Sequence, residues 1–222
     1  MAQKINIVFK CNPKGWESDW VKEVFSLDSF DIQNRNFVGE NCIIITDNPR
    51  QCLFSGFLKQ GLDFILINLK DEFIPSKQDH DIYESEYCKF VFRNYFRRHY
   101  SGSKFSSFPL GYKHEFWKGC NDKKRQLLQL NPDRKYIWSF AGVIKKSGRR
   151  KALQGLSKIK PNFVHPVSGW DTADSLSTLD YRDLLCSSYF VPCFRGNCSL
   201  ECFRIYESLE CGAIPIVQKK SH

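Results

Sequence analysis

The sequence lacks any apolar run that approaches the roughly 18 residues needed to cross a membrane, and its best candidates, Asp63 to Leu69 and Cys42 to Thr46, have the length of strands. It therefore predicts no membrane span. Residues 1–10 lack the apolar core and cleavage site of a secretory signal, which favours a cytoplasmic location. No C-x-x-C pair occurs among the ten cysteines, which argues against a zinc site and, without an oxidising compartment, predicts reduced thiols.

What the chain does contain is enough apolar material for a substantial core. Of its 222 residues, 42% are hydrophobic and 15% aromatic, which excludes the disordered class. Thirty-three Lys and Arg residues against 24 Asp and Glu give a net charge of +9. This charge favours an anionic partner, which could be nucleic acid, a membrane surface or a phosphate-bearing small molecule.

Alternating strand and helix patterns predict an α/β fold with two lobes. Residues 1–118 are predicted to form an N-terminal lobe, 119–134 a connector, and 135–222 a C-terminal lobe. Strands separated by helices of this length indicate right-handed crossovers and parallel sheets. The predicted strands are Lys4–Phe9, Asn41–Thr46, Phe64–Leu69, Cys88–Asn94, Phe108–Tyr112, Tyr136–Phe140, Asn162–Val167, Tyr189–Phe194 and Ala213–Val217. Helices are predicted over Trp16–Phe25, Ser147–Ile159, Thr178–Ser187 and Ser199–Cys211.

A basic, glycine-containing loop follows the predicted strand that ends at Phe140. It runs from Ala141 to Arg150 and opens a helix. Gly142 would let the backbone approach a phosphate, and Arg149 would supply a forked, permanently charged donor. The spacing differs from that of a P-loop. The alternative interpretation is a solvated basic helix start.

A second loop, Arg195-Gly196-Asn197, leads into the helix predicted over Ser199–Cys211. At 100° per residue, an apolar face containing Leu209 is expected to cover the sheet. Arg204 and Glu207 fall on the opposite side, where Arg204 could reach a diphosphate and Glu207 the hydroxyls of a ribose. The alternative is an ordinary surface ion pair.

The string from Tyr181 to Val217 resembles the nucleotide-sugar-binding segment of exostosin-like glycosyltransferases. It contains the pattern F-R-x-x-E, beginning at Phe203, and G-x-I-P, beginning at Gly212. Within that group it looks most similar to the ribitol xylosyltransferase type. Two departures stand out: Ser208 replaces a common alanine, and the chain stops five residues after Val217. The C-terminal lobe is therefore expected to be either truncated or minimal.

The resemblance implies a GT-B-like fold, with two Rossmann-like lobes whose parallel sheets face a cleft. It implies transfer of a sugar, with xylose a candidate, from a nucleotide diphosphate sugar to a hydroxyl of a glycan or polyol, with inversion. A UDP-linked donor is favoured, and no cofactor or metal is required. The residues expected to hold the donor are Gly142, Arg149, Arg195, Gly196, Asn197, Arg204 and Glu207.

Inverting transfer also needs a base that accepts the proton of the acceptor hydroxyl. Asp71 and Glu72 follow the predicted strand Phe64–Leu69 and are the candidates that best fit the end-of-strand rule, although they could equally cap a turn. His114 is a second candidate because its ordinary pKa of about 6.5 suits proton transfer.

Three other functions fit parts of the sequence. An α1,3-fucosyltransferase-like enzyme that uses GDP-fucose would have a similar C-terminal string, but the residues around Arg195 and Arg204 depart from that pattern. A nucleic-acid-binding protein could use the aromatic and basic patch Tyr95–Tyr100. The basic residues are dispersed and no known motif is present, so no nucleic-acid partner is expected. The fold could also persist without catalysis.

Overall fold

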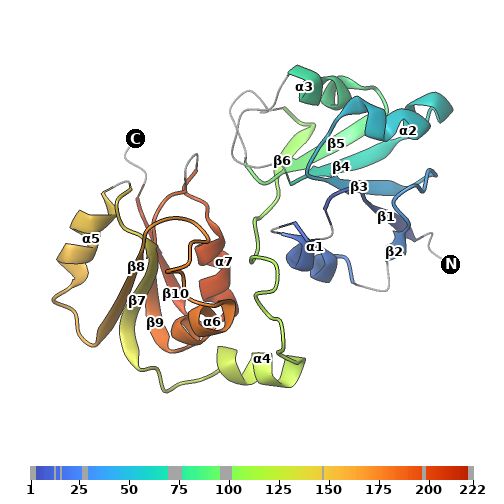
Figure 1. Cartoon of the computed structure of the whole chain (residues 1–222). Helices are drawn as coiled ribbons and strands as arrows, with labels where there is room; N and C mark the ends of the chain where they lie inside the picture. The colour runs from blue at the N-terminus through green and yellow to red at the C-terminus, as the bar shows by residue number, and fades with distance from the viewer. Residues whose placement is uncertain are drawn as a thin grey trace. The chain divides into compact units, whose positions relative to one another are not determined.

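The computed structural model describes residues 4–12, 14–15, 17–26, 30–69, 77–95, 102–146, 148–196 and 199–219, with only the backbone described at 77–80. The chain divides into two compact units, unit 1 over Met1–Leu110 and unit 2 over Gly111–His222 (Figure 1). Each unit is built on a parallel sheet with helices. The predicted fold class, α/β with two Rossmann-like parts, is therefore confirmed.

Unit 1 contains a six-stranded sheet in the order β2-β1-β3-β4-β5-β6, in which every neighbouring pair is parallel. The chain runs outward from β1 in both directions, which is the pattern of a doubly wound sheet. Its elements are β1 (Ile5–Phe9), α1 (Ser18–Val24), β2 (Phe30–Gln33), β3 (Cys42–Thr46), η1 (Gln51–Phe54), α2 (Ser55–Gln60), β4 (Phe64–Asn68), α3 (Lys77–Glu84), β5 (Cys88–Arg93) and β6 (Phe105–Ser107).

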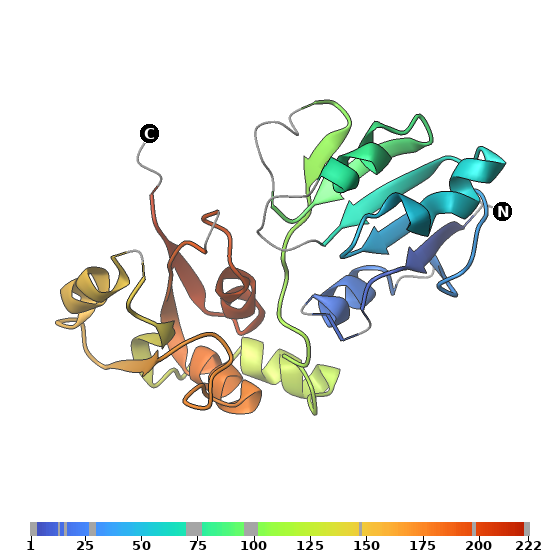
Figure 2. The ribbon, with the colours of Figure 1, turned by 45° about the horizontal axis from the view of Figure 1, so that its top comes forward.

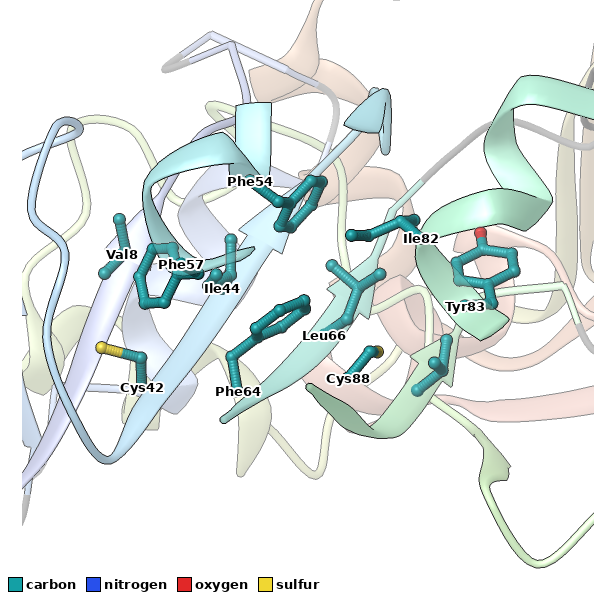
Figure 3. Close-up of a cluster of buried hydrophobic side chains, with 11 residues drawn as sticks. Val8, Cys42, Ile44, Phe54, Phe57, Phe64, Leu66, Ile82, Tyr83 and Cys88 are labelled. Atoms are coloured by element: carbon teal, nitrogen blue, oxygen red, sulfur yellow. The ribbon is translucent and has the colours of Figure 1, made fainter. Parts of the chain in front are cut away.

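Helices cover both faces of the unit 1 sheet. Ile44 of β3 packs with Phe54 and Phe57 of η1 and α2 in one buried cluster (Figure 3). The next residue, Ile45, points to the other face and packs in a second cluster with Val21 of α1. Because successive residues of a strand alternate between faces, a strand buried on both faces is apolar throughout. This explains why β3 and β4 stand out as continuous apolar runs in the sequence.

Unit 2 contains a four-stranded parallel sheet in the order β10-β9-β7-β8. Figure 2 shows α5 on one side of this sheet and α6 and α7 together on the other. Its elements are α4 (Asp122–Gln129), β7 (Tyr136–Val143), α5 (Arg149–Leu156), β8 (Asn162–Val167), α6 (Thr178–Cys186), β9 (Ser188–Cys193), α7 (Phe203–Glu210) and β10 (Ile214–Val217).

One arginine, Arg134, makes several hydrogen bonds at the edge of the unit 2 sheet where its strands begin. The guanidinium of Arg134 donates hydrogen bonds to the carbonyl oxygens of Gln129, Leu185, Cys186, Ser188 and Cys211, at distances from 2.9 to 3.4 Å. Gly212 lies beside it with φ +66, and a Cβ there would lie 2.1 Å from the Gln129 oxygen. The C-terminal ends of α4, α6 and α7 therefore converge on one charged side chain.

Several predicted boundaries differ from the structure. The predicted strand Phe108–Tyr112 is wrong, because β6 ends at Ser107 and Pro109 has no N–H for a further ladder bond. Strand β7 continues to Val143, so Gly142 lies in the end of a strand rather than in a loop. The elements β2, η1, α2, α3 and β6 were not predicted from the sequence. The predicted helix starts at Trp16 and Ser147 lie outside the described residues.

Candidate anion site at the carboxyl edge of unit 2

The order of strands in unit 2 marks a position for ligand binding. From β7 the chain passes through α5 to β8, whereas from the neighbouring strand β9 it passes through α7 to β10, in the opposite direction. The loops that leave β7 and β9 therefore diverge, and in open parallel sheets ligands bind outside the carboxyl ends of the strands at such a point. The two loops that the sequence points to, Ala141–Arg150 and Arg195–Asn197, begin here.

Arg149 bridges the ends of these two strands. It is the first residue of α5, and it follows Gly148, whose φ is +68. Its Nη1 donates to the Val143 carbonyl at 3.0 Å, and its Nη2 donates to the Arg195 carbonyl at 2.9 Å. Burial and the nearby Arg204 charge lower the pKa of Arg149 from its ordinary value. The carboxyl edge thus holds a partly desolvated positive charge.

Arg204 reaches the same edge from α7. Its Nη2 donates to the Ala141 carbonyl at 2.7 Å, and its guanidinium carbon lies 4.7 Å from the centre of the Phe140 ring. Gly142 makes this approach possible, because it has φ +147 and a Cβ there would lie 2.7 Å from the Arg204 Nη2. The group close to the Gly142 backbone is therefore an arginine of this chain, and the predicted approach of a phosphate there stays a prediction.

The two arginines rest on a pair of aromatic rings, and each retains an unused donor. Phe140 and Phe194 pack edge to face with centroids 5.3 Å apart, and the Arg149 guanidinium lies 5.9 Å from the Phe194 ring. The Nε atoms of both arginines are buried and have no hydrogen-bond partner. Buried donors of this kind normally find a partner, and a charged acceptor forms the strongest bonds with arginine. The arrangement therefore suits an anion.

Glu207 lies on the buried side of α7, which corrects the helical-wheel prediction. Its side chain is 4% exposed, whereas Leu209, expected to face the sheet, is 56% exposed. One Glu207 oxygen accepts the Lys113 backbone N–H at 3.3 Å, and the other accepts the Tyr181 hydroxyl at 3.1 Å. Burial raises the pKa of Glu207 above its ordinary value, against the opposing effect of Arg204.

A hollow of about 420 Å³ lies along the first turn of α5. Three of its six lining residues are basic and none is acidic: Ile144, Lys145, Gly148, Arg150, Lys151 and Gln154. The predicted basic loop therefore forms one wall of an open surface depression next to Arg149. Positive charge in such a depression raises the local concentration of anions.

The remaining predicted residues are placed only in part. The Arg195 carbonyl accepts from Arg149, and its N–H donates to Gln218 at 3.3 Å. Gly196 follows it, half-buried. Asn197 and both candidate bases, Asp71 and Glu72, lie outside the described residues. The second candidate base, His114, belongs to unit 2 and is half-buried.

A pair of thiols beside Arg204 was not predicted from the sequence. Cys202 occupies the N-cap position of α7, and its thiol is hydrogen-bonded to that of Cys193, at the end of β9. This bond and the Arg204 charge lower the pKa of Cys202 to about 7, while the same bond and burial raise that of Cys193. The thiols stand nine residues apart, so only the turn between β9 and α7 brings them together.

Among the described residues, no cluster of three or more His, Cys, Asp or Glu side chains could hold a metal ion. The D-x-D spacing, typical of diphosphate sites that use a metal, occurs once in the sequence, at Asp79 and Asp81 in α3 of unit 1. The helices in the described ranges include none that is both long and apolar enough to cross a bilayer.

These features define unit 2 as a Rossmann-like α/β unit with two arginines, a candidate anion site, at its switch point. Residues 117–222 match the family model described as RXYLT1 C-terminal domain. The chain is 32% identical over 94 residues to ribitol-5-phosphate xylosyltransferase 1 of Homo sapiens and of Mus musculus, which covers 40% of this chain and 21% of each relative. The Danio rerio protein of that name is 32% identical over 96 residues, with the same coverage.

The predicted closeness to the ribitol xylosyltransferase group is therefore confirmed for the C-terminal half, which contains both arginines of the candidate anion site. The chain spans about a fifth of the length of the curated relatives that it matches.

Proposed function

We propose that this chain is a glycosyltransferase that moves a sugar from a nucleotide diphosphate sugar to an acceptor hydroxyl. The observation that carries the proposal is the convergence of Arg149 and Arg204 at the carboxyl edge of a unit similar to named xylosyltransferases. The relatives' names favour xylose as the sugar and a ribitol phosphate, which is a polyol, as the acceptor. A UDP-linked donor is the form we expect.

In this proposal the arginines act on the leaving group. The acceptor oxygen attacks the anomeric carbon of the sugar while a base takes the acceptor proton. The bond from that carbon to the diphosphate breaks, and negative charge accumulates on the diphosphate. Fixed cationic donors aimed at this charge stabilise the transition state without reorganisation. Arg149 and Arg204 would supply the compensating positive charge with no metal, assisted by the basic hollow along α5.

The other predicted roles follow from the same edge. Arg195, Gly196 and Asn197 would form the rim around the phosphate or donor sugar. Contact of Glu207 with a ribose hydroxyl would require one of its two internal hydrogen bonds to be exchanged or shared. Asp71 and Glu72 remain the candidates for the base, and the configuration of the transferred sugar would invert.

Titration calorimetry with UDP tests this proposal. Arg204→Ala removes a forked charged contact, which costs about 1.5 to 3 kcal/mol and so weakens binding about ten- to a hundredfold. Lys158→Ala is the matched control, because it removes one exposed positive charge after the C-terminal end of α5. Unchanged UDP affinity in a folded Arg204→Ala variant would contradict the proposal. Tighter binding of GDP than of UDP would favour the fucosyltransferase-like alternative.

A further inference from the structure

The loop after β8 presents a tryptophan at the same carboxyl edge. Trp170 follows the end of β8 by three residues and is 56% exposed. The loop around it is held by the Asp174 carboxylate, which accepts hydrogen bonds from the Ser168 N–H at 2.7 Å and the Thr172 hydroxyl at 2.5 Å. These hydrogen bonds lower the pKa of Asp174, and the bond from Thr172 has the largest effect. The ring is therefore carried on a pre-ordered loop.

Two neighbours support the Trp170 ring. The buried ring of Phe203 lies with its centre 6.4 Å from that of Trp170, at an interplanar angle of 38°. Lys113 Nζ lies 5.5 Å from the centre of the Trp170 ring and forms an ion pair with Asp171 at 2.8 Å. Phe203 immediately precedes Arg204 in α7. The residue that supports the Trp170 ring and an arginine of the candidate anion site therefore belong to the same helical turn.

Lys113 and α7 connect the ring to the two arginines at this edge. Lys113 lies beside Trp170, and its backbone N–H donates to Glu207. Glu207 lies one turn along α7 from Arg204. An exposed aromatic ring suits a base and an arginine suits a diphosphate, and both stand at the same carboxyl edge.

We propose that Trp170 is the stacking platform for the nucleobase of the donor, with Lys113 as the positive charge beside it. This inference rests on the proposed function, and it deepens it by assigning the base-binding end of the donor site. A flat aromatic base can stack on an exposed tryptophan, and such stacking strengthens the binding of a base to a protein. A polyol acceptor has no aromatic face and would gain little from this ring.

The test compares a nucleotide with its diphosphate part alone, in the full chain. UDP and inorganic pyrophosphate are titrated calorimetrically into the wild type, Trp170→Ala, Trp170→Phe and Tyr189→Ala. Tyr189 is the matched control, because it is an exposed aromatic residue at the opposite end of β9, where its hydroxyl donates to the Pro132 carbonyl. Circular dichroism checks that each variant is folded.

We expect Trp170→Ala to weaken UDP binding about tenfold or more and to leave pyrophosphate binding unchanged. Trp170→Phe should restore most of the loss, and Tyr189→Ala should behave as the wild type. Unchanged UDP binding in Trp170→Ala would overturn this inference while leaving the proposed function standing, provided that Arg204→Ala still loses UDP. An equal loss of pyrophosphate would also overturn it. A wild type that binds no nucleotide would overturn both.

Discussion

Replacement of Gly142 by alanine is expected to damage stability and donor binding together. The backbone there has φ +147, a conformation that costs an L-residue about 1 to 3 kcal/mol. The new Cβ would also lie 2.7 Å from the Arg204 Nη2, so the 2.7 Å hydrogen bond to the Ala141 carbonyl could not persist. Loss of a bond from a charged donor adds about 1.5 to 3 kcal/mol. The expected decrease in the free energy of unfolding is therefore about 3 kcal/mol or more.

Urea denaturation measures this loss, and calorimetry with UDP measures its consequence, which should be at least a tenfold weaker affinity because Arg204 is displaced. Gly155→Ala is the control. Gly155 lies in α5, and a Cβ there would meet nothing within 4 Å, so alanine should be neutral or stabilise by up to about 1 kcal/mol. If Gly142→Ala retained both its stability to within 1 kcal/mol and its UDP affinity, the reasoning about Arg204 would be refuted.

Two further predictions use the pKa shifts of buried side chains. Burial raises the pKa of Glu207 in the folded chain above its unfolded value near 4.5. The protonated carboxyl therefore contributes stability that is fully present below pH 4.5. This contribution is lost as the pH rises through the folded pKa. Glu207→Gln should therefore flatten the dependence of unfolding free energy on pH in that window, and an unchanged slope would contradict the shift. The pKa of Cys202, beside Cys193, is about 7, so iodoacetamide should alkylate this thiol with a midpoint near pH 7. Burial raises the pKa of Cys88 to about 11, so this thiol should not react at neutral pH. Mass spectrometry of the alkylated chain checks this, and a Cys202 midpoint near pH 9 would contradict it.

The central strands could be predicted from the sequence because both faces of the sheet are covered, so side chains on either face of such a strand are buried. In β3, both Ile44 and Ile45 are fully buried, so the whole run is apolar and bounded by polar loops. Short edge elements such as β2 could not be predicted, because Asp31 and Gln33 interrupt the apolar pattern there. The loops after β7 and β9 could also be found, since polar residues at the ends of parallel strands share one edge.

The sequence by itself determined the class of fold, the motif from Phe203 to Glu207 and the presence of two arginines near one strand edge. Only the tertiary structure decided which way α7 faces. A helical wheel ranks side chains by hydrophobicity and places Glu207 outside, but its hydrogen-bond partners, Lys113 and Tyr181, lie 94 and 26 residues away in the chain. A buried carboxylate is tolerated when distant groups supply donors to it, and those donors come together only when the chain folds.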